Sequence, residues 1–271
     1  MTYLEYGLTE NMGIVMLSGE IGTGKTTLTQ YMIERLDSVA EIAFVPNPNS
    51  STDQLLGLIL NQIGLSPKRG RAATLDVIKR YLEQKHSEQK QVYIVIDDAQ
   101  NLSSEALEEM RVLSNFQTEN PAFLQIMLVG EPQFLEKIRN SKYQELARRI
   151  TVHYHLKGLD RKETGNYISF RLQKGGGAPD LFTPDAVDAI YRITRGIPRS
   201  INLLCQMALV CGYVNESGRI DNMIIEQIAR DNIGIGLEPA FEFSAAEADP
   251  DLKKEEVILS RLGILEKKST N

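Results

Sequence analysis

Short apolar segments alternate with helix-like segments along the first half of the chain. The apolar segments are rich in β-branched residues, and the segments between them carry apolar residues at helical spacing. Continuous apolar strands that alternate with helices are typical of a parallel sheet covered on both faces. Five segments fit such strands, namely residues 13–18, 41–46, 92–97, 124–130 and 150–156. Intervening helices are predicted around residues 26–36, 55–63, 75–82 and 107–116. The pattern therefore predicts an α/β fold.

The pattern changes after Leu156, because no later segment is typical of a strand. Four helix-like segments, separated by Gly, Pro and polar residues, cover residues 160–174, 184–195, 198–214 and 222–232. We therefore expect a core domain over residues 1–157 and a small all-helical domain over residues 158–233. Residues 234–271 form an acidic tail, whose short helix-like stretch near its end either packs back on the body or binds a partner.

A glycine-rich segment follows the first predicted strand and precedes the first predicted helix. It reads SGEIGTGKTT and fits the pattern G-x-x-x-x-G-K-[ST]. Its glycines let backbone N–H groups approach phosphate oxygens, and the helix that follows directs its positive end to the same place. Lys25 offers a cation to the outer phosphates, and Thr26 offers a hydroxyl to Mg²⁺. The predicted phosphate-binding residues are Gly19, Gly22, Thr23, Gly24, Lys25, Thr26 and Thr27.

Two carboxylates, Asp97 and Asp98, follow the third predicted strand. Ligands of a parallel sheet bind at the carboxyl ends of its strands, so these side chains are expected beside the glycine-rich segment. Asp97 is placed to hold Mg²⁺ through water, and Asp98 is placed to orient or activate an attacking water. No N-K-x-D stretch follows, which disfavours a GTPase that reads guanine.

Further charged residues lie at positions where nucleotide-hydrolysing proteins place side chains that contact the γ-phosphate. Glu131 follows the fourth strand, where a polar side chain can sense a γ-phosphate. Arg148 and Arg149 precede the fifth strand, and either belongs to a solvated helix end or reaches a neighbouring subunit's γ-phosphate as an arginine finger. Arg199 follows a helix-starting proline, and either contacts phosphates from the helical domain or has a surface role.

These segments together resemble the AAA+ ATPases, and more closely the general secretion pathway protein A group, which includes ATPases of pilus and exosortase gene clusters. The resemblance rests on GEIGTGKTT, VIDDAQNL, LVGEP, LARRI and GIPRSINLLC, and it covers about residues 3–233. It implies a P-loop NTPase core with a five-stranded sheet, a helical lid, hydrolysis of ATP with Mg²⁺, and homo-oligomers with shared active sites. The resemblance also implies a role for each matching residue. Lys25 binds phosphate, Thr26 and Asp97 bind the metal, and Asp98 occupies the catalytic acid position. Arg149 is the arginine finger, and Arg199 is the sensor of the lid.

The sequence departs from the AAA+ pattern in three ways. Asp98 stands where most members carry the longer Glu, so water activation is expected to be slower or to use a second water. Glu131 stands where Asn, Thr or Gln is more common. Family members also carry an aromatic and Pro-containing stretch that helps to enclose adenine and that comes before the point where this sequence begins. Loss of that adenine wall would weaken nucleotide affinity without changing the phosphate chemistry.

Charge and composition limit the partners. The net charge of −6 and the pI near 5.3 argue against sequence-independent binding to DNA, because such binding relies on many Lys and Arg contacts to phosphates. Cys205 and Cys211 lie in an apolar helix and are expected to be buried thiols, while His153 and His155 are expected to line one face of a strand. No apolar run approaches the roughly 18 residues of a spanning helix, so we expect a cytoplasmic protein that reaches the inner membrane only through a partner.

Three functions share the glycine-rich segment. The first is a Mg²⁺-dependent ATPase that assembles or remodels a secretion, pilus or exopolysaccharide apparatus through a protein partner. The alternative is a nucleotide-switched DNA-binding adaptor of the transposition-ATPase type, for which the basic loop SPKRGR at residues 66–71 is either a contact or only a solvated loop. A P-loop kinase is disfavoured, because kinases need neither a helical lid of this type nor a finger from a neighbour.

Overall fold

We describe a computed structural model, which covers residues 13–36, 40–48, 52–119 and 124–231. The predictions for the start of the chain, and for the acidic tail with its short helix, lie outside the described residues. Among the described helices, none combines the length and the apolar character that a membrane crossing requires.

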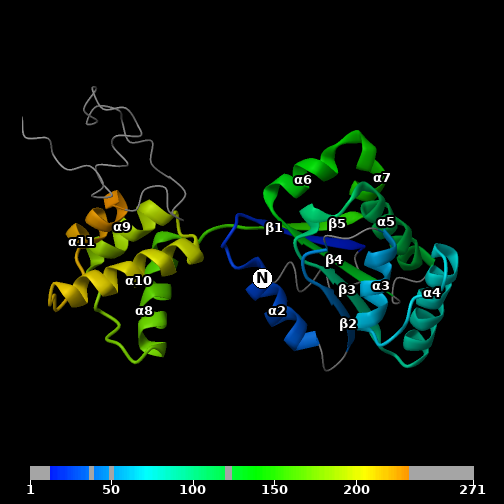
Figure 1. Cartoon of the computed structure of the whole chain (residues 1–271), viewed down its shortest axis with the longest axis horizontal. Coiled ribbons are helices and arrows are strands. Elements are labelled where there is room, and N and C mark those ends of the chain that lie inside the picture. Colours follow the sequence, from blue (N-terminus) through cyan, green and yellow to red (C-terminus); the bar gives the residue numbers. More distant parts are fainter. Residues whose placement is uncertain (1–12, 37–39, 49–51, 120–123, 232–271) are drawn as a thin grey trace, which may run out of the picture.

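The core is a five-stranded parallel sheet with the order β2-β3-β4-β1-β5, as predicted for the fold class (Figure 1). Each strand lies within one residue of its predicted position. Strands β1 and β4 are buried along their whole length, which explains their continuous apolar sequence, whereas the edge strand β5 alternates between half-buried and exposed residues. The strands are β1 (Ile14–Gly19), β2 (Ala40–Val45), β3 (Gln91–Ile96), β4 (Leu124–Gly130) and β5 (Ile150–Leu156).

Helices cover both faces of this sheet, because successive strand residues point to opposite sides. On one face Val15 and Leu17 pack with Met32 of α2, and on the other Ile14 and Met16 join a larger cluster that includes residues of α3, α4 and α5. Figure 1 shows α2 on one side of the sheet and α3, α4 and α5 on the other. These helices are α2 (Lys25–Leu36), α3 (Thr52–Gln62), α4 (Arg71–Ser87) and α5 (Ser104–Glu119).

Two short helices between β4 and β5, α6 (Pro132–Arg139) and α7 (Gln144–Ala147), were not predicted. They are joined by a 3₁₀ turn, η2 (Ser141–Tyr143), and another such turn, η1 (Ala99–Asn101), follows β3. Phe134, Ile138 and Leu146 anchor α6 and α7 in the core. Helices of this length show too few periodic positions for a sequence pattern to reveal them.

The C-terminal helices form a group with a hydrophobic cluster of its own, which lies to one side of the sheet in Figure 1. Their bounds agree within one residue with the four predicted helices. The thiols of Cys205 and Cys211 are free, and burial raises the pKa of Cys205 to about 12. The helices are α8 (Arg161–Lys174), α9 (Pro184–Thr194), α10 (Pro198–Val214) and α11 (Asn222–Asp231).

The segment between β5 and α8 is joined closely to the turn that precedes α10. The N–H of Leu159 donates to the carbonyl of Gly196 at 2.8 Å. A Cβ atom on Gly196 would lie 1.8 Å from the Leu159 oxygen, and one on Gly158 would lie 2.5 Å from the Arg195 oxygen. Only glycine fits at both positions, so the backbones of the two segments lie in direct contact at this joint.

Candidate nucleotide-binding site

The glycine loop between β1 and α2 closes around the side chain of Lys25. Its Nζ atom donates to the carbonyl oxygens of Gly19 at 2.8 Å and Glu20 at 3.0 Å, and the side chain is buried. Gly22 and Gly24 have positive φ angles of 82° and 97°, which other residues adopt only with strain. The loop thus places a cation beside the unpaired N–H groups at the start of α2, which is the arrangement that binds phosphate oxygens.

The three threonines of the segment lie in different environments. Thr23 is buried, and its hydroxyl donates to the Glu20 carbonyl at 2.9 Å, so this side chain closes the loop rather than facing a ligand. Thr26 and Thr27 are exposed on the first turn of α2. Sequence reasoning assigned all three residues to phosphate binding without separating these positions.

A hydrogen bond connects the glycine loop to the end of β3. The Thr26 hydroxyl donates to Oδ2 of Asp97 at 2.7 Å, and the N–H of Asp98 donates to Oδ1 of Asp97 at 2.9 Å. The Asp97 side chain is buried. The hydroxyl and the carboxylate predicted to share a cation are therefore in direct contact.

The donor set at this point fits Mg²⁺, which prefers oxygen ligands and takes few of them from the protein. Among the described residues, no group of three or more His, Cys, Asp or Glu side chains is arranged to hold a metal. A Mg²⁺ ion held by Thr26 and Asp97 would therefore complete its shell with water and phosphate oxygens, as is usual at nucleotide sites.

Asp98 and Glu131 lie at neighbouring strand ends and share one partner. Asp98 has a left-handed backbone, with φ 52° and ψ 41°, and Glu131 follows β4. The Nε2 atom of Gln100 donates to Oδ1 of Asp98 and to Oε1 of Glu131, at 3.2 Å each. The N–H of Glu131 in turn donates to Oε1 of Gln100 at 3.2 Å. Sequence reasoning missed Gln100, although it lies within the quoted segment VIDDAQNL.

Arg199 is brought to the glycine loop by the helical group. Its backbone N–H donates to the Gly22 carbonyl at 3.2 Å, while its side chain is exposed. A Cβ atom on Gly22 would lie 2.6 Å from Cβ of Arg199, so the absence of a side chain at Gly22 permits this approach. The long helix α10 therefore begins at the phosphate end of the site.

Arg149 does not join these residues within one chain. Its carbonyl accepts from the N–H of Ile14 at 2.9 Å, which places it at the end of β1 opposite to the glycine loop. A strand rises about 3.3 Å per residue, so the two ends of β1 lie roughly 17 Å apart. The Arg149 side chain donates to Oδ1 of Asn115 at 3.0 Å, and the exposed Arg148 pairs with Glu145 at 3.5 Å.

The two strand histidines do more than line a face of β5. The Ser18 hydroxyl lies 2.8 Å from Nε2 of His153 and 2.9 Å from Nδ1 of His155. Partial burial, together with the nearby charges of His155 and Arg139, lowers the pKa of His153. The pairing of β5 with β1 creates this contact, so the pattern within β5 alone did not reveal it.

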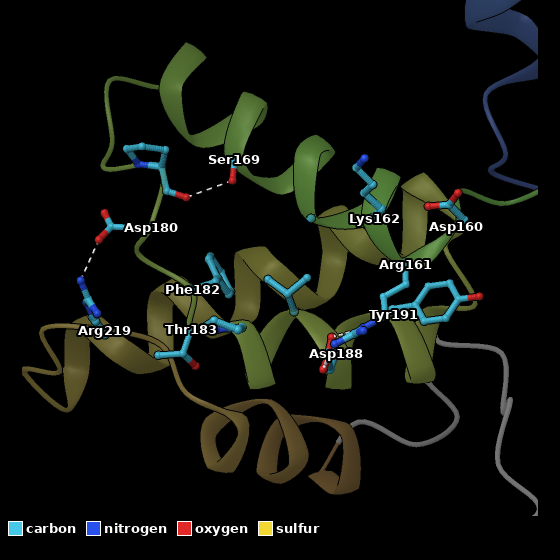
Figure 2. A pocket seen from close by; sticks show the side chains of 14 residues that line it. Asp160, Arg161, Lys162, Ser169, Asp180, Phe182, Thr183, Asp188, Tyr191 and Arg219 are labelled. Carbon is cyan, nitrogen blue, oxygen red and sulfur yellow. Dashed lines mark hydrogen bonds and ion pairs between the residues drawn. The ribbon is translucent and has the colours of Figure 1, made fainter.

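A groove of about 1020 Å³ lies in the helical group, and it includes no predicted site residue. Figure 2 shows its lining, with Arg219 paired to Asp180 at 2.7 Å and Arg161 paired to Asp188. The Ser169 hydroxyl donates to the Pro179 carbonyl at 3.1 Å. Because these charges are paired within the groove, we assign no chemistry to it.

Comparison with known proteins identifies the fold and the relatives of the chain. A family model described as AAA domain matches residues 8–138. General secretion pathway protein A of Aeromonas hydrophila is 35% identical over 237 residues, which are 87% of this chain and 43% of that protein. The chain thus spans less than half of the length of this curated relative.

Solved structures agree on the fold. The ORC2 protein of Aeropyrum pernix, solved as ADPNP-ADP complexes, is 19% identical with a TM-score of 0.59, covering 86% of this chain and 66% of that one. The RuvB branch migration motor of Thermotoga maritima is 18% identical with a TM-score of 0.57, covering 84% and 65%. At these identities the likeness concerns the fold alone. The resemblance predicted from the sequence is confirmed by the matched domain and by the secretion-pathway relative.

Proposed function

Since this chain carries an AAA domain on a P-loop NTPase fold, and is related to a secretion-pathway protein, we propose that it is a Mg²⁺-dependent ATPase. The observation that carries the proposal is the contact between the glycine loop and β3. The Thr26 hydroxyl lies 2.7 Å from the buried Asp97 carboxylate, beside a loop that encloses the cation of Lys25. An anion-binding loop with an adjoining oxygen site for a hard cation suits a nucleoside triphosphate with its Mg²⁺.

Each site residue has a role in this proposal. Lys25 and the N–H groups of the loop would hold the outer phosphates of ATP. Thr26 and Asp97 would hold Mg²⁺, which would supply positive charge to neutralise the phosphate oxygens. Asp98 accepts a hydrogen bond from the water that attacks the γ-phosphorus, as the bond to ADP breaks. Glu131 senses the γ-phosphate at the end of β4, and Arg199 approaches the phosphates from the helical lid.

We propose that the active site is shared between subunits of a homo-oligomer. Arg149 lies at the far end of β1 from its own glycine loop, so a role in catalysis requires the site of a neighbouring subunit. An arginine that acts in this way stabilises the charge that develops on the transferred phosphoryl group. Within each subunit we assign residues 1–157 to the core and residues 158–233 to the lid. The core would contact the nucleotide through the glycine loop, and the lid would contact it through Arg199.

We further propose that hydrolysis serves the assembly or remodelling of a secretion, pilus or exopolysaccharide apparatus. Support comes from the 35% identity to general secretion pathway protein A of Aeromonas hydrophila. Such a protein acts in the cytoplasm and reaches the inner membrane through a protein partner. A DNA partner is less favoured, because the formal net charge is −6.

The substitution Lys25→Ala tests the nucleotide site. We expect loss of ATP binding, measured with a fluorescent ATP analogue, and loss of phosphate release, because the buried cation of the loop disappears. Lys68→Ala is the matched control, since Lys68 is exposed in the loop before α4. Unchanged binding and turnover in Lys25→Ala would contradict the proposal.

The partner class is tested by what stimulates turnover. At moderate salt we expect purified apparatus proteins, rather than double-stranded DNA, to raise the rate of phosphate release. Stimulation by DNA alone, lost as salt rises, would instead favour the nucleotide-switched DNA adaptor.

A further inference from the structure

We propose that Gln100 is a positioning residue that sets the Asp98 carboxylate for water activation and couples it to Glu131. The inference rests on the proposed ATPase function and deepens it. The Gln100 side chain makes three hydrogen bonds at the ends of two neighbouring strands, and all three involve Asp98 or Glu131. It acts through Asp98 and takes no part in the reaction itself.

The carboxamide is suited to this place because it both donates and accepts. Its nitrogen donates to one oxygen of Asp98 and one of Glu131, at 3.2 Å each, and its oxygen accepts from the Glu131 N–H. Two carboxylates that meet one donor in this way would repel each other if the donor were lost. Neither a carboxylate nor an apolar side chain at position 100 could supply the same set of bonds.

Gln100 is itself held in place by the surrounding elements. It lies in η1, and Lys137 of α6 donates to the carbonyls of Gln100 at 3.2 Å and Leu102 at 2.7 Å. The last residue of β4 is Gly130, where an added Cβ would lie 3.1 Å from Oε1 of Gln100. The glycine therefore leaves room for the amide between the strand ends, and α6 fixes the backbone that carries it.

The geometry has a consequence for catalysis. Gln100 binds Oδ1 of Asp98, which leaves Oδ2 to accept a hydrogen bond from the attacking water. Asp98 is one methylene shorter than Glu, so its carboxylate depends more on being held in one orientation. If the γ-phosphate displaced Glu131, the Gln100 amide would move with it, and the Asp98 carboxylate, which is bonded to the same amide, would change its orientation.

The test combines Gln100→Met, which keeps the length of the side chain and removes its hydrogen bonds, with Asp98→Asn. We expect Gln100→Met to lower kcat for phosphate release by about tenfold or more while the Kd for a fluorescent ATP analogue changes less than about twofold. In the double variant the rate should equal that of Asp98→Asn alone, because Gln100 acts through Asp98. Gln62→Met is the matched control, since Gln62 is exposed at the end of α3.

Gln100→Glu serves as a second, nearly isosteric variant if the Met side chain impairs folding. It removes both donated bonds and adds a third carboxylate, so we expect a larger loss of kcat at unchanged Kd. A wild-type kcat in either folded variant would overturn the inference, and so would rate losses that multiply in the double variant. A wild-type protein without turnover would overturn the proposed ATPase function, which distinguishes that failure from this one.

Discussion

Two consecutive aspartates at the end of β3 differ in what surrounds them. Asp97 is buried, with bonds from Thr26 and from the N–H of Asp98. Asp98 is half-buried and adopts a left-handed backbone, which turns the chain into η1 and directs its side chain toward Gln100. Backbones of this kind are uncommon outside glycine and cluster at functional sites. The backbone turn therefore separates a cation ligand from a water-orienting group.

The substitution Asp98→Asn separates binding from hydrolysis. We expect ATP binding to persist, because Lys25, Thr26 and Asp97 are unchanged, and phosphate release to fall by about 100-fold, since the amide is a much weaker base. Measurement of Kd with a fluorescent analogue and of kcat by phosphate release checks both parts. Normal turnover would show that Asp98 does not orient the water.

His153 predicts a pH dependence of stability. Its pKa is lowered from the ordinary value near 6.5, so the unfolded chain binds more protons than the folded one in the window just below that value. The free energy of unfolding should therefore fall as the pH decreases from 7.5 to 5.5. His153→Gln should show a smaller fall, measured by urea unfolding at both pH values. An equal fall in both proteins would contradict this assignment.

At the scale of elements, local signals explain why the longer helices were predicted well. Helix α8 begins with a capping box, in which Asp160 accepts from the N–H of Glu163 at 2.8 Å and Glu163 accepts from the N–H of Asp160 at 2.8 Å. Prolines begin α9 and α10. The joint before α10 has no comparable signal, because Gly196 and Leu159 lie far apart in the sequence.

Gly196→Ala should loosen this joint. Gly196 has a φ of 73°, and its Cβ would lie 1.8 Å from the Leu159 oxygen, so we expect a loss of more than about 2 kcal/mol in the free energy of unfolding. Gly176→Ala is the control, since its φ is 78° and no atom lies within 4 Å of its Cβ. It should cost only about 1 kcal/mol. Urea unfolding measures both, and equal losses would argue against a steric joint.

At the scale of the whole molecule, a shared active site predicts complementation. Arg149→Ala should lower turnover, because this subunit no longer supplies an arginine finger to the active site of its neighbour. Lys25→Ala should lose nucleotide binding in its own active site but still supply Arg149 to the neighbouring one. Mixing the two inactive variants should restore part of the turnover, measured against the mixing ratio. Arg80→Ala is the control, as Arg80 is 77% exposed on α4. The absence of any recovery in mixed oligomers would contradict a shared site.

Local patterns in the sequence were sufficient to predict several features of the fold and of the site. Apolar runs specified the five strands, periodic positions specified the longer helices, and the glycine pattern specified the loop that encloses Lys25. Asp97 and Asp98 were found because they follow an apolar strand of a parallel sheet, whose ligands bind at the carboxyl ends of its strands, and because a glycine-rich phosphate-binding pattern accompanies them. In each case the signal lies within a few residues of the chain.

Which of these local features contact one another depends on how the strands are arranged in the folded chain. Strand β4 pairs between β3 and β1, which brings Glu131 to Gln100 and hence to Asp98. The pairing of β5 with β1 brings both histidines to Ser18, and the same pairing holds Arg149 at the opposite end of the sheet from the glycine loop. Contacts of this kind join residues that are distant in sequence and depend on strand order and register, for which a single chain carries no local signal.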